Sequence, residues 1–141
     1  MQDVSGRNST DATTPDDGMF RTLVEASIQG MLVHRDQKPL FVNDSWAEIH
    51  GLTREDVLAM DTVLPLIHTV EHQRLLGFMT SRMRGDDAPA RYEYRAVHRD
   101  GSVIWLENLV RVVEWVDGPA VLASIVDVTQ KKQAEQALRE S

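Results

Sequence analysis

Three residues in the middle of the chain have the spacing of a zinc-peptidase motif. His68, Glu71 and His72 form the pattern H-x-x-E-H, in which two histidines on one helix face bind zinc and the glutamate activates water. A pattern with three fixed positions arises often by chance. A peptidase of this class also needs a third ligand from a later helix, which this sequence does not supply. We therefore assign no metal site to the motif.

A second candidate site consists of polar side chains within predicted strands. Tyr92 and Tyr94 share one face of a strand, and Asn108 lies between Leu106 and Val110 on one face of the next. A buried amide needs hydrogen-bond partners. Two interpretations stay open: Asn108 and the tyrosine hydroxyls orient a small ligand, or Asn108 pairs with a neighbour or a water in a filled core.

Composition excludes several functional classes. The chain of 141 residues has no cysteine, which rules out disulfides, thiolate metal sites and covalent adducts through a thiol. Its net charge of −7 argues against binding nucleic acid through its phosphates. No apolar run approaches the length of a membrane span. We expect a single globular domain in the cytoplasm.

Three antiparallel strands between residues 90 and 129 hold the tyrosines and the asparagine. Asp100-Gly101 and Asp117-Gly118 separate alternating apolar segments. Asp-Gly favours a type I′ hairpin turn, because both central residues of that turn need positive φ. The sequence therefore predicts a β-meander that leads directly into a charged helix.

Two strands and several helices are predicted before the meander. The strands span residues 31–34 and 39–43, and a leading helix begins near residue 18 and ends at Gly30. A longer helix covers about residues 68–84. Its apolar stripe consists of Leu75, Leu76, Met79 and Met83.

The two short helices between these elements begin at capping boxes. Ser45-x-x-Glu48 opens the first helix and Thr53-x-x-Asp56 opens the second. The resulting order, β-β-α-α-α-β-β-β with a helix at each end, indicates an α+β fold with helices over one face of an antiparallel sheet. We interpret residues 1–17 as a flexible lead, 18–129 as the domain and 130–141 as the start of a coiled-coil linker.

Short motifs in a fixed order connect the chain with a known family. They are Gly30-Met-Leu-Val, Leu40-Phe-Val-Asn, Asp44-Ser-Trp-Ala-Glu-Ile-His-Gly, Leu66-Ile-His, Tyr92-Glu-Tyr-Arg, Arg99-Asp-Gly-Ser-Val-Ile-Trp and Asp127-Val-Thr. With these motifs, residues 19–130 resemble a PAS domain of the sensory-box type, found in histidine kinases, cyclic-di-nucleotide enzymes and related signalling proteins. Leu66-Ile-His also accounts for His68 without a metal. His34 and Gln37 depart from the aspartate and glycine that are usual in the family.

The resemblance implies a five-stranded antiparallel sheet whose helices enclose a cavity. It also selects which strand faces point inward, and it suggests a small apolar or aromatic ligand. The residues expected around that ligand are Met31, Val33, Leu75, Leu76, Met79, Tyr92, Tyr94, Leu106, Asn108, Val110, Ala123 and Ile125.

The family's cofactors can be compared with this sequence position by position. Flavin adducts and thioester-linked chromophores need cysteine and are excluded here. Haem-binding members carry a proximal histidine where Leu75 stands and often an arginine where Tyr92 stands. His72 lies one turn before Leu75, so haem would require a shifted helix and is not expected. Noncovalent flavin stays open.

The same resemblance suggests how a signal leaves the domain. Asp127 and Thr129 end the sheet and begin the exit helix, either as a hinge or as a plain helix cap. The output would be a covalently linked domain such as a histidine kinase or a cyclic-di-GMP enzyme. A homodimer is expected through apolar residues of the leading helix and the outer sheet face, namely Phe20, Leu23, Val24, Trp105 and Trp115.

Two other functions are alternatives to a ligand-binding sensor. A ligand-free dimerisation module would have a pocket filled by its own side chains. A small α+β-barrel enzyme would use a tyrosine and an acid in the pocket. The enzyme lacks support, because no aspartate or glutamate falls on the expected inward strand positions.

Overall fold

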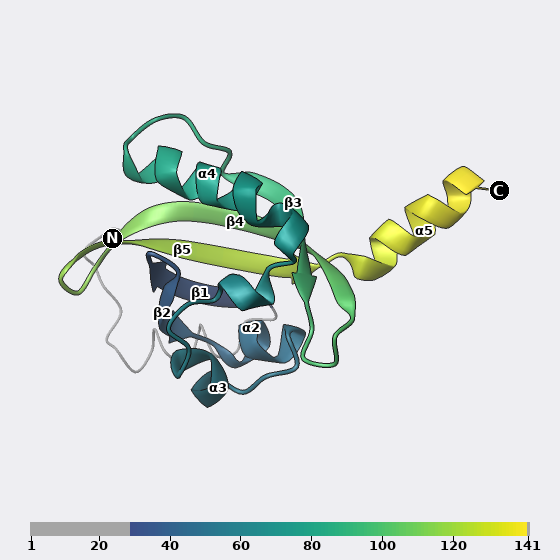
Figure 1. Cartoon of the computed structure of the whole chain (residues 1–141), viewed down its shortest axis with the longest axis horizontal. Coiled ribbons are helices and arrows are strands. Elements are labelled where there is room, and N and C mark those ends of the chain that lie inside the picture. The colour runs from purple at the N-terminus through teal and green to yellow at the C-terminus, as the bar shows by residue number, and fades with distance from the viewer. Residues whose placement is uncertain (1–28, 141) are drawn as a thin grey trace, which may run out of the picture.

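The computed structural model describes residues 29–140 and contains a five-stranded antiparallel sheet in the order β2-β1-β5-β4-β3 (Figure 1). The predicted α+β fold is thereby confirmed. The predicted leading helix, with Phe20, Leu23 and Val24, lies outside the described residues. The strands are β1 Gly30–Arg35, β2 Lys38–Val42, β3 Arg91–Val97, β4 Val103–Trp115 and β5 Gly118–Asp127. The helices are α2 Asp44–Ile49, α3 Arg54–Leu58, α4 His72–Met83 and α5 Thr129–Glu140, with 3₁₀ turns η1 Leu64–Leu66 and η2 Thr69–Glu71.

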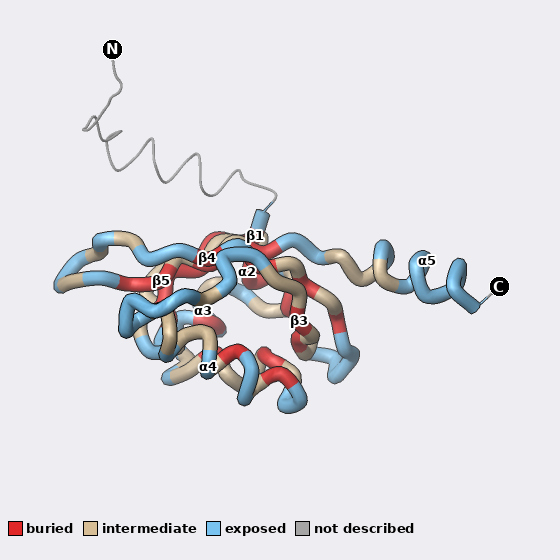
Figure 2. The backbone as a smooth tube through the Cα atoms, turned by 90° about the horizontal axis from the view of Figure 1, so that it is seen from above, coloured by how far each residue is buried: buried red, intermediate tan, exposed pale blue. Residues whose placement is uncertain are grey.

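The helices between β2 and β3 lie against the sheet, whereas α5 projects away from it. Figure 1 shows α2 and α3 beside β1 and β2, and α4 near β3 and β4. Buried positions, red in Figure 2, concentrate in the sheet, whereas α5 is mostly exposed. No helix of the described region has the length and apolar character that crossing a membrane would need. The core therefore lies between the sheet and the helices that precede β3.

Two hairpin turns depend on residues in the left-handed region. Asp117 (φ 67°) and Gly118 (φ 121°) connect β4 to β5, as Asp-Gly predicts. Asp36 (φ 52°) and Gln37 (φ 67°) connect β1 to β2 in the same way without a glycine. The β1–β2 turn thus places Gln37 beside a hollow that α4 and β5 also line.

The predicted type I′ turn at Asp100-Gly101 is wrong. Only Gly101 has a positive φ, of 90°, and a five-residue loop connects Val97 to Val103. The Asp100 carboxylate accepts hydrogen bonds from Ser102 N at 2.9 Å and Ser102 Oγ at 2.6 Å. Asp100 therefore stabilises the loop through its side chain.

Asn43 caps α2, which corrects the capping box predicted at Ser45. Its Oδ1 accepts hydrogen bonds from Trp46 N at 3.0 Å and Met31 N at 2.9 Å, and its Nδ2 donates to Gln29 O at 3.0 Å. The Asn43 amide accepts from both segments through Oδ1 and donates through Nδ2 at the same time. Asn43, fully buried, thus joins the start of β1 to the start of α2.

The long helix predicted from His68 is divided in two. A 3₁₀ turn covers Thr69–Glu71, and the α-helix begins only at His72. His68 caps the turn, because its Nδ1 accepts a hydrogen bond from Val70 N at 3.2 Å. The break turns Glu71 toward the sheet, where Arg95 of β3 binds its carboxylate.

Candidate ligand site

A small inner cavity lies between the sheet and the helices that cover it. Its volume is about 30 Å³, which is close to the space of one water molecule. Apolar side chains and a few polar ones form its wall. The lining residues are Leu32, His34, Trp46, His50, Val63, Leu66, Ile67, Leu75, Met79, Arg82, Tyr92, Tyr94, Asn108, Val110, Val121 and Ala123.

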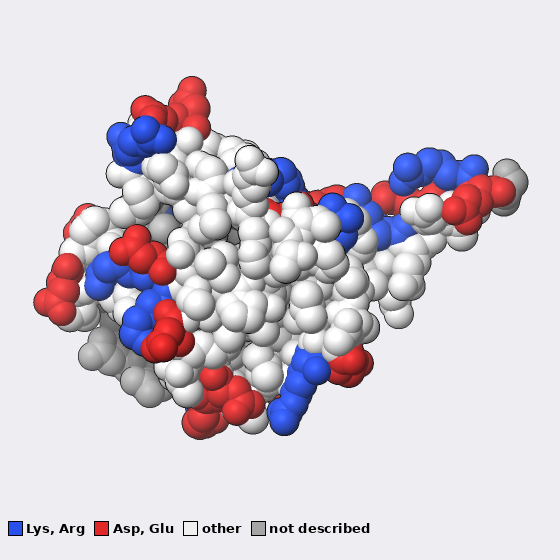
Figure 3. All heavy atoms as spheres, viewed as in Figure 1, with Lys and Arg blue, Asp and Glu red and all other residues white. Residues whose placement is uncertain are grey.

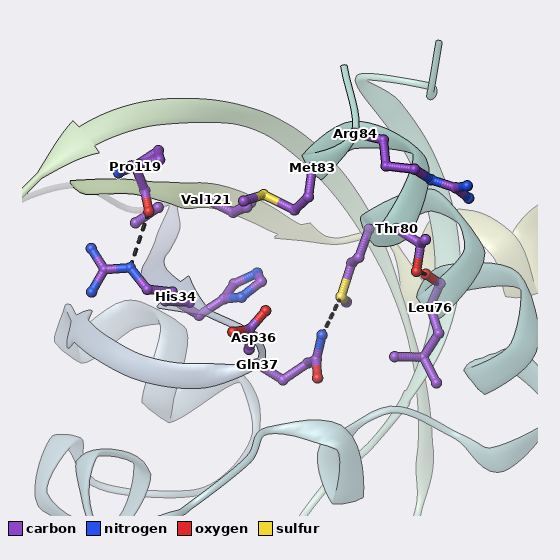
Figure 4. Close-up of a pocket in the computed structure, with 12 residues that line it drawn as sticks. His34, Asp36, Gln37, Leu76, Thr80, Met83, Arg84, Pro119 and Val121 are labelled. Atoms are coloured by element: carbon purple, nitrogen blue, oxygen red, sulfur yellow. Dashed lines mark hydrogen bonds between the residues drawn. The ribbon is translucent and has the colours of Figure 1, made fainter. Parts of the chain in front are cut away.

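A larger outer hollow of about 540 Å³ adjoins the inner cavity (Figure 4). The β1–β2 turn, the second half of α4 and the start of β5 surround it. His34, Met79 and Val121 line both spaces and therefore mark where they meet. Gln37 Nε2 donates to Met79 Sδ at 2.9 Å across this boundary.

Three buried polar atoms in the described part of the chain have no hydrogen-bond partner. They are His34 Nδ1, Trp46 Nε1 and Asn108 Oδ1. All three residues line the inner cavity, and each side chain is at least nine-tenths buried. The other end of the Asn108 amide is satisfied, because Nδ2 donates to Tyr92 Oη at 3.2 Å. Buried polar groups are nearly always paired, so these three residues make the inner cavity the candidate site in the described part of the chain.

The two histidines of the cavity wall are uncharged at neutral pH. Burial lowers the pKa of His34 to about 4, with a smaller contribution from the Arg82 charge. Burial also lowers the pKa of His50 to about 4, against a hydrogen bond to the Trp46 carbonyl. Burial raises the pKa of Tyr92 and Tyr94. These groups are therefore uncharged at neutral pH and act as hydrogen-bonding groups.

Most of the predicted pocket residues do line the two spaces. Seven line the inner cavity: Leu75, Met79, Tyr92, Tyr94, Asn108, Val110 and Ala123. Leu76 lines only the outer hollow. Leu106 and Ile125 are fully buried in the core beside the cavity rather than on its wall.

Met31 and Val33 were predicted to face inward, and the structure contradicts this. Both line a hollow of about 340 Å³ on the other face of the sheet, with Phe41 and Trp115. The register explains the reversal, because Leu32 pairs with Ala123, and residues paired across strands share a face. Moving a strand by one residue exchanges its two faces, so Leu32 and His34 take the inward positions.

Four further residues of the cavity wall, Trp46 and His50 from α2 and its end, His34 from β1 and Arg82 from α4, were not predicted from the sequence. Trp46 and His50 are four residues apart around α2, and their rings lie 4.1 Å apart between centroids. The i,i+4 spacing of two aromatic rings was an available signal for this pair. For His34, the available signal was its position at the end of a short apolar strand. No sequence signal was available for Arg82, because it lies on the polar side of the helical pattern of α4.

The H-x-x-E-H residues have structural contacts within the chain. His72 Nε2 donates to the carbonyls of Leu64 at 3.0 Å and Ile67 at 2.7 Å. Burial raises the pKa of Glu71, but hydrogen bonds from Arg95 and Arg74 outweigh it, so that the pKa is lowered. Glu71 is 4% exposed, and both of its carboxylate oxygens are bound by arginines. The motif thus holds η2 and α4 against β3.

A comparison with family models decides the family. The model described as PAS fold matches residues 39–126. The chain belongs to the PAS family. A blue-light-activated histidine kinase of Brucella ovis is 31% identical over 87 residues, which are 62% of this PAS domain chain and 17% of the kinase.

Two further comparisons agree with this family. The sensor histidine kinase TmoS of Ectopseudomonas mendocina is 26% identical over 139 residues, covering 95% of this chain and 14% of that protein. This PAS domain therefore spans a small part of its curated relatives. A sensory box histidine kinase/response regulator from Burkholderia thailandensis has the same fold, with a TM-score of 0.64 and 22% identity, covering 85% of this chain and 92% of that structure.

The exit of the PAS domain is held by a compact set of hydrogen bonds. Thr129 N and Oγ1 both donate to Asp127 Oδ1, at 2.9 and 2.6 Å. Trp105 N of β4 donates to Thr129 Oγ1 at 2.9 Å. The first residue of α5 is thereby attached both to the end of β5 and to the neighbouring strand.

A row of charged and aromatic side chains continues from this exit toward α4. Lys132 Nζ lies 4.9 Å from the centre of the Trp105 ring, and Arg95 Cζ lies 5.2 Å from it. Lys132 also forms an ion pair with Glu93 of β3. Arg95 Nε binds Glu71 Oε2 at 3.1 Å. Charges of both signs continue along α5 in Figure 3.

Proposed function

We propose that this PAS domain binds a small molecule at the inner cavity and outer hollow, and that α5 passes the change to a linked output domain. The signal-sensing role follows from the family, whose relatives here are named sensor and light-activated histidine kinases. The cluster of three unpartnered polar atoms at the cavity carries the ligand proposal. The output would be a histidine kinase or a cyclic-di-GMP enzyme, the setting the cytoplasm, and the domain itself non-catalytic.

Substitution of Asn108 tests the binding role. Asn108→Leu keeps the branched shape and the number of side-chain heavy atoms but removes the unpaired oxygen and the hydrogen bond to Tyr92. We therefore expect a co-purifying molecule to be lost or bound about tenfold more weakly, as for one buried hydrogen bond. Native mass spectrometry of the purified domain gives the bound mass. Leu109→Ala is the matched control, because Leu109 is the next residue of β4 and is exposed. A folded Asn108→Leu domain with unchanged ligand retention would contradict the proposal.

The proposed route from the cavity to α5 begins at the tyrosine that binds Asn108. Arg74 Cζ lies 5.9 Å from the centre of the Tyr92 ring, and Arg74 binds Glu71. Glu71 binds Arg95, which contacts the same Trp105 ring as Lys132. A ligand that moves Tyr92 would shift this contiguous row, and Asp127 and Thr129 would act as the hinge.

Lys132→Met should loosen the start of α5, because it removes the ion pair with Glu93 and the cation over Trp105 while retaining the aliphatic stem. A cation–π contact and an exposed ion pair together contribute about 1 kcal/mol, which corresponds to roughly fivefold faster amide exchange in the first turns of α5. Hydrogen exchange with and without ligand measures this. Lys131→Met is the control. Equal exchange in both variants would remove Lys132 from the proposed route.

A ligand-free dimerisation module is the second candidate function. The 30 Å³ inner cavity favours it, because this volume alone holds little more than a water. The hollow on the outer sheet face, where the Trp115 and Phe41 rings lie 6.3 Å apart, offers an apolar surface for a partner. Trp105 is less available, since Arg95 and Lys132 already contact its ring. Sedimentation together with an empty native mass spectrum would select this function.

A further inference from the structure

We infer that the ligand is a neutral amphipathic molecule with one hydroxyl head, which enters the inner cavity while its apolar body occupies the outer hollow. This inference rests on the proposed function and adds the chemical class and the orientation of the ligand. It depends on the hydrogen-bonding types of the unpartnered atoms, the charges around them and the different sizes of the two spaces.

The unpartnered atoms require a head group that both donates and accepts. Trp46 Nε1 can only donate, and Asn108 Oδ1 can only accept while Nδ2 is bound to Tyr92. A hydroxyl can both donate and accept through a single heavy atom, and a head of this size fits a volume of about 30 Å³. A carboxylate would leave the Asn108 oxygen without a donor. An ammonium group would leave the Trp46 N–H without an acceptor.

The charges around the inner cavity also favour a neutral head. No carboxylate belongs to the described residues of its wall. His34 and His50 are neutral at pH 7, because burial lowers the pKa of each to about 4. Arg82 is the cation of this wall, and its guanidinium already donates to Pro89 O. An ammonium head would therefore find no carboxylate in the described part of this wall, at a high cost of desolvation, and a carboxylate head would have Arg82 as its one ionic partner there.

The apolar body has a defined path from the inner cavity. The two spaces meet at His34, Met79 and Val121. Beyond them, Leu76 and Met83 of α4 line the outer hollow (Figure 4). Its volume of about 540 Å³ lies within the range of small-molecule sites. Methionines adapt to ligands of different shape, and a thioether is a weak acceptor, so the Gln37–Met79 contact can open.

Three compounds of equal chain length separate the head groups: 1-hexanol, hexanoate and hexylamine. We expect 1-hexanol to bind at least tenfold more tightly than either ion at pH 7, measured by NMR titration of the purified domain. The indole N–H signal of Trp46 should move on binding, because its proton gains an acceptor. The chain has three tryptophans, and Trp115, on the opposite sheet face, supplies an internal control whose signal should stay in place.

Trp46→Phe removes the indole donor and retains an aromatic ring. We expect this variant to bind 1-hexanol about tenfold more weakly, the effect of one hydrogen bond. Equal or tighter binding of hexanoate or hexylamine, or an unmoved Trp46 signal in the unsubstituted domain, would overturn the hydroxyl assignment. If 1-hexanol does not bind but native mass spectrometry finds another molecule, the inference fails and the proposed function stands. If no molecule binds at all, both fail.

Discussion

Lowering the pH from 7 to 5 should reduce the free energy of unfolding by about 4 kcal/mol, because two buried histidines resist protonation. Burial lowers the pKa of His34 and of His50 to about 4. In the unfolded chain a histidine has a pKa of about 6.5. At pH 5 each unfolded histidine has gained a proton that its folded counterpart has not, which costs about 2 kcal/mol per residue.

The direction in which stability changes with pH, and the pH range of that change, distinguish the histidines from the acidic groups. A lowered histidine pKa gives stability that is full above pH 6.5 and is lost as the pH falls toward 4. Glu71, Asp56 and Asp100 also have lowered pKa values. Their contributions persist above the ordinary carboxyl pKa of about 4 and are lost only below it. The decline between pH 6.5 and 5 therefore belongs to the histidines.

Urea unfolding between pH 5 and pH 8 measures this decline. A His34→Gln, His50→Asn variant should lose most of the slope between pH 6.5 and 5, since neither new side chain titrates. His50→Asn also keeps an N–H near the Trp46 carbonyl, which His50 Nδ1 contacts at 2.9 Å. NMR of the unsubstituted domain gives a second reading, because the His34 and His50 ring signals should stay in the neutral position at pH 5. Ordinary titration of both rings near pH 6.5 would contradict the prediction.

Asn43→Ala should lower the free energy of unfolding by about 4 kcal/mol. The substitution leaves the N–H groups of Met31 and Trp46 and the carbonyl of Gln29 without their side-chain partner. A buried N–H group without a partner costs about 1–3 kcal/mol, and the losses at Met31 and Trp46 are not fully additive. Because Asn43 is fully buried, water cannot replace it without rearrangement. Thermal and urea unfolding measure the effect.

Thr53→Ala is the matched control for the Asn43 substitution. Thr53 also caps a helix: its Oγ1 accepts from Asp56 N at 3.1 Å, and its own N–H donates to Asp56 Oδ2 at 3.0 Å. This cap is exposed, so water can take over the lost bond, and we expect a loss of about 1 kcal/mol. Equal losses in the two variants would show that Asn43 acts as an ordinary helix cap and does not join β1 to α2.

Local patterns in the sequence predicted the structure correctly where the pattern lies within a single strand, turn or helix end. Alternating apolar residues predicted the meander, and Asp117-Gly118 predicted its second turn, because strand period and turn chemistry act over a few residues. The Thr53 capping box was predicted and is present. Asn108 was placed on the inward face of β4 by alternation and family resemblance, and it lines the cavity.

Local patterns did not predict the features that depend on contact between two different segments of the chain. Met31, Leu32 and Val33 are all apolar, so the strand itself does not show which face is buried. Pairing with β5 decides this. Ser45 and Asn43 are both good helix caps, and the position of β1 selects Asn43. The Glu71 carboxylate binds Arg95, which lies 24 positions later in the chain. No helical or strand period relates two residues at that separation.

The chain's residue types and their short-range spacing were enough to specify the order of the elements, the family and the absence of thiol chemistry, because propensity, periodicity and composition are properties of neighbouring residues. The candidate site was decided by packing. Its three unpartnered atoms come from β1, α2 and β4, and their residues line one cavity only because β1 pairs with β5 and Asn43 joins α2 to β1. Burial then makes the histidines neutral, because the cost of desolvating a charge depends on everything that surrounds it.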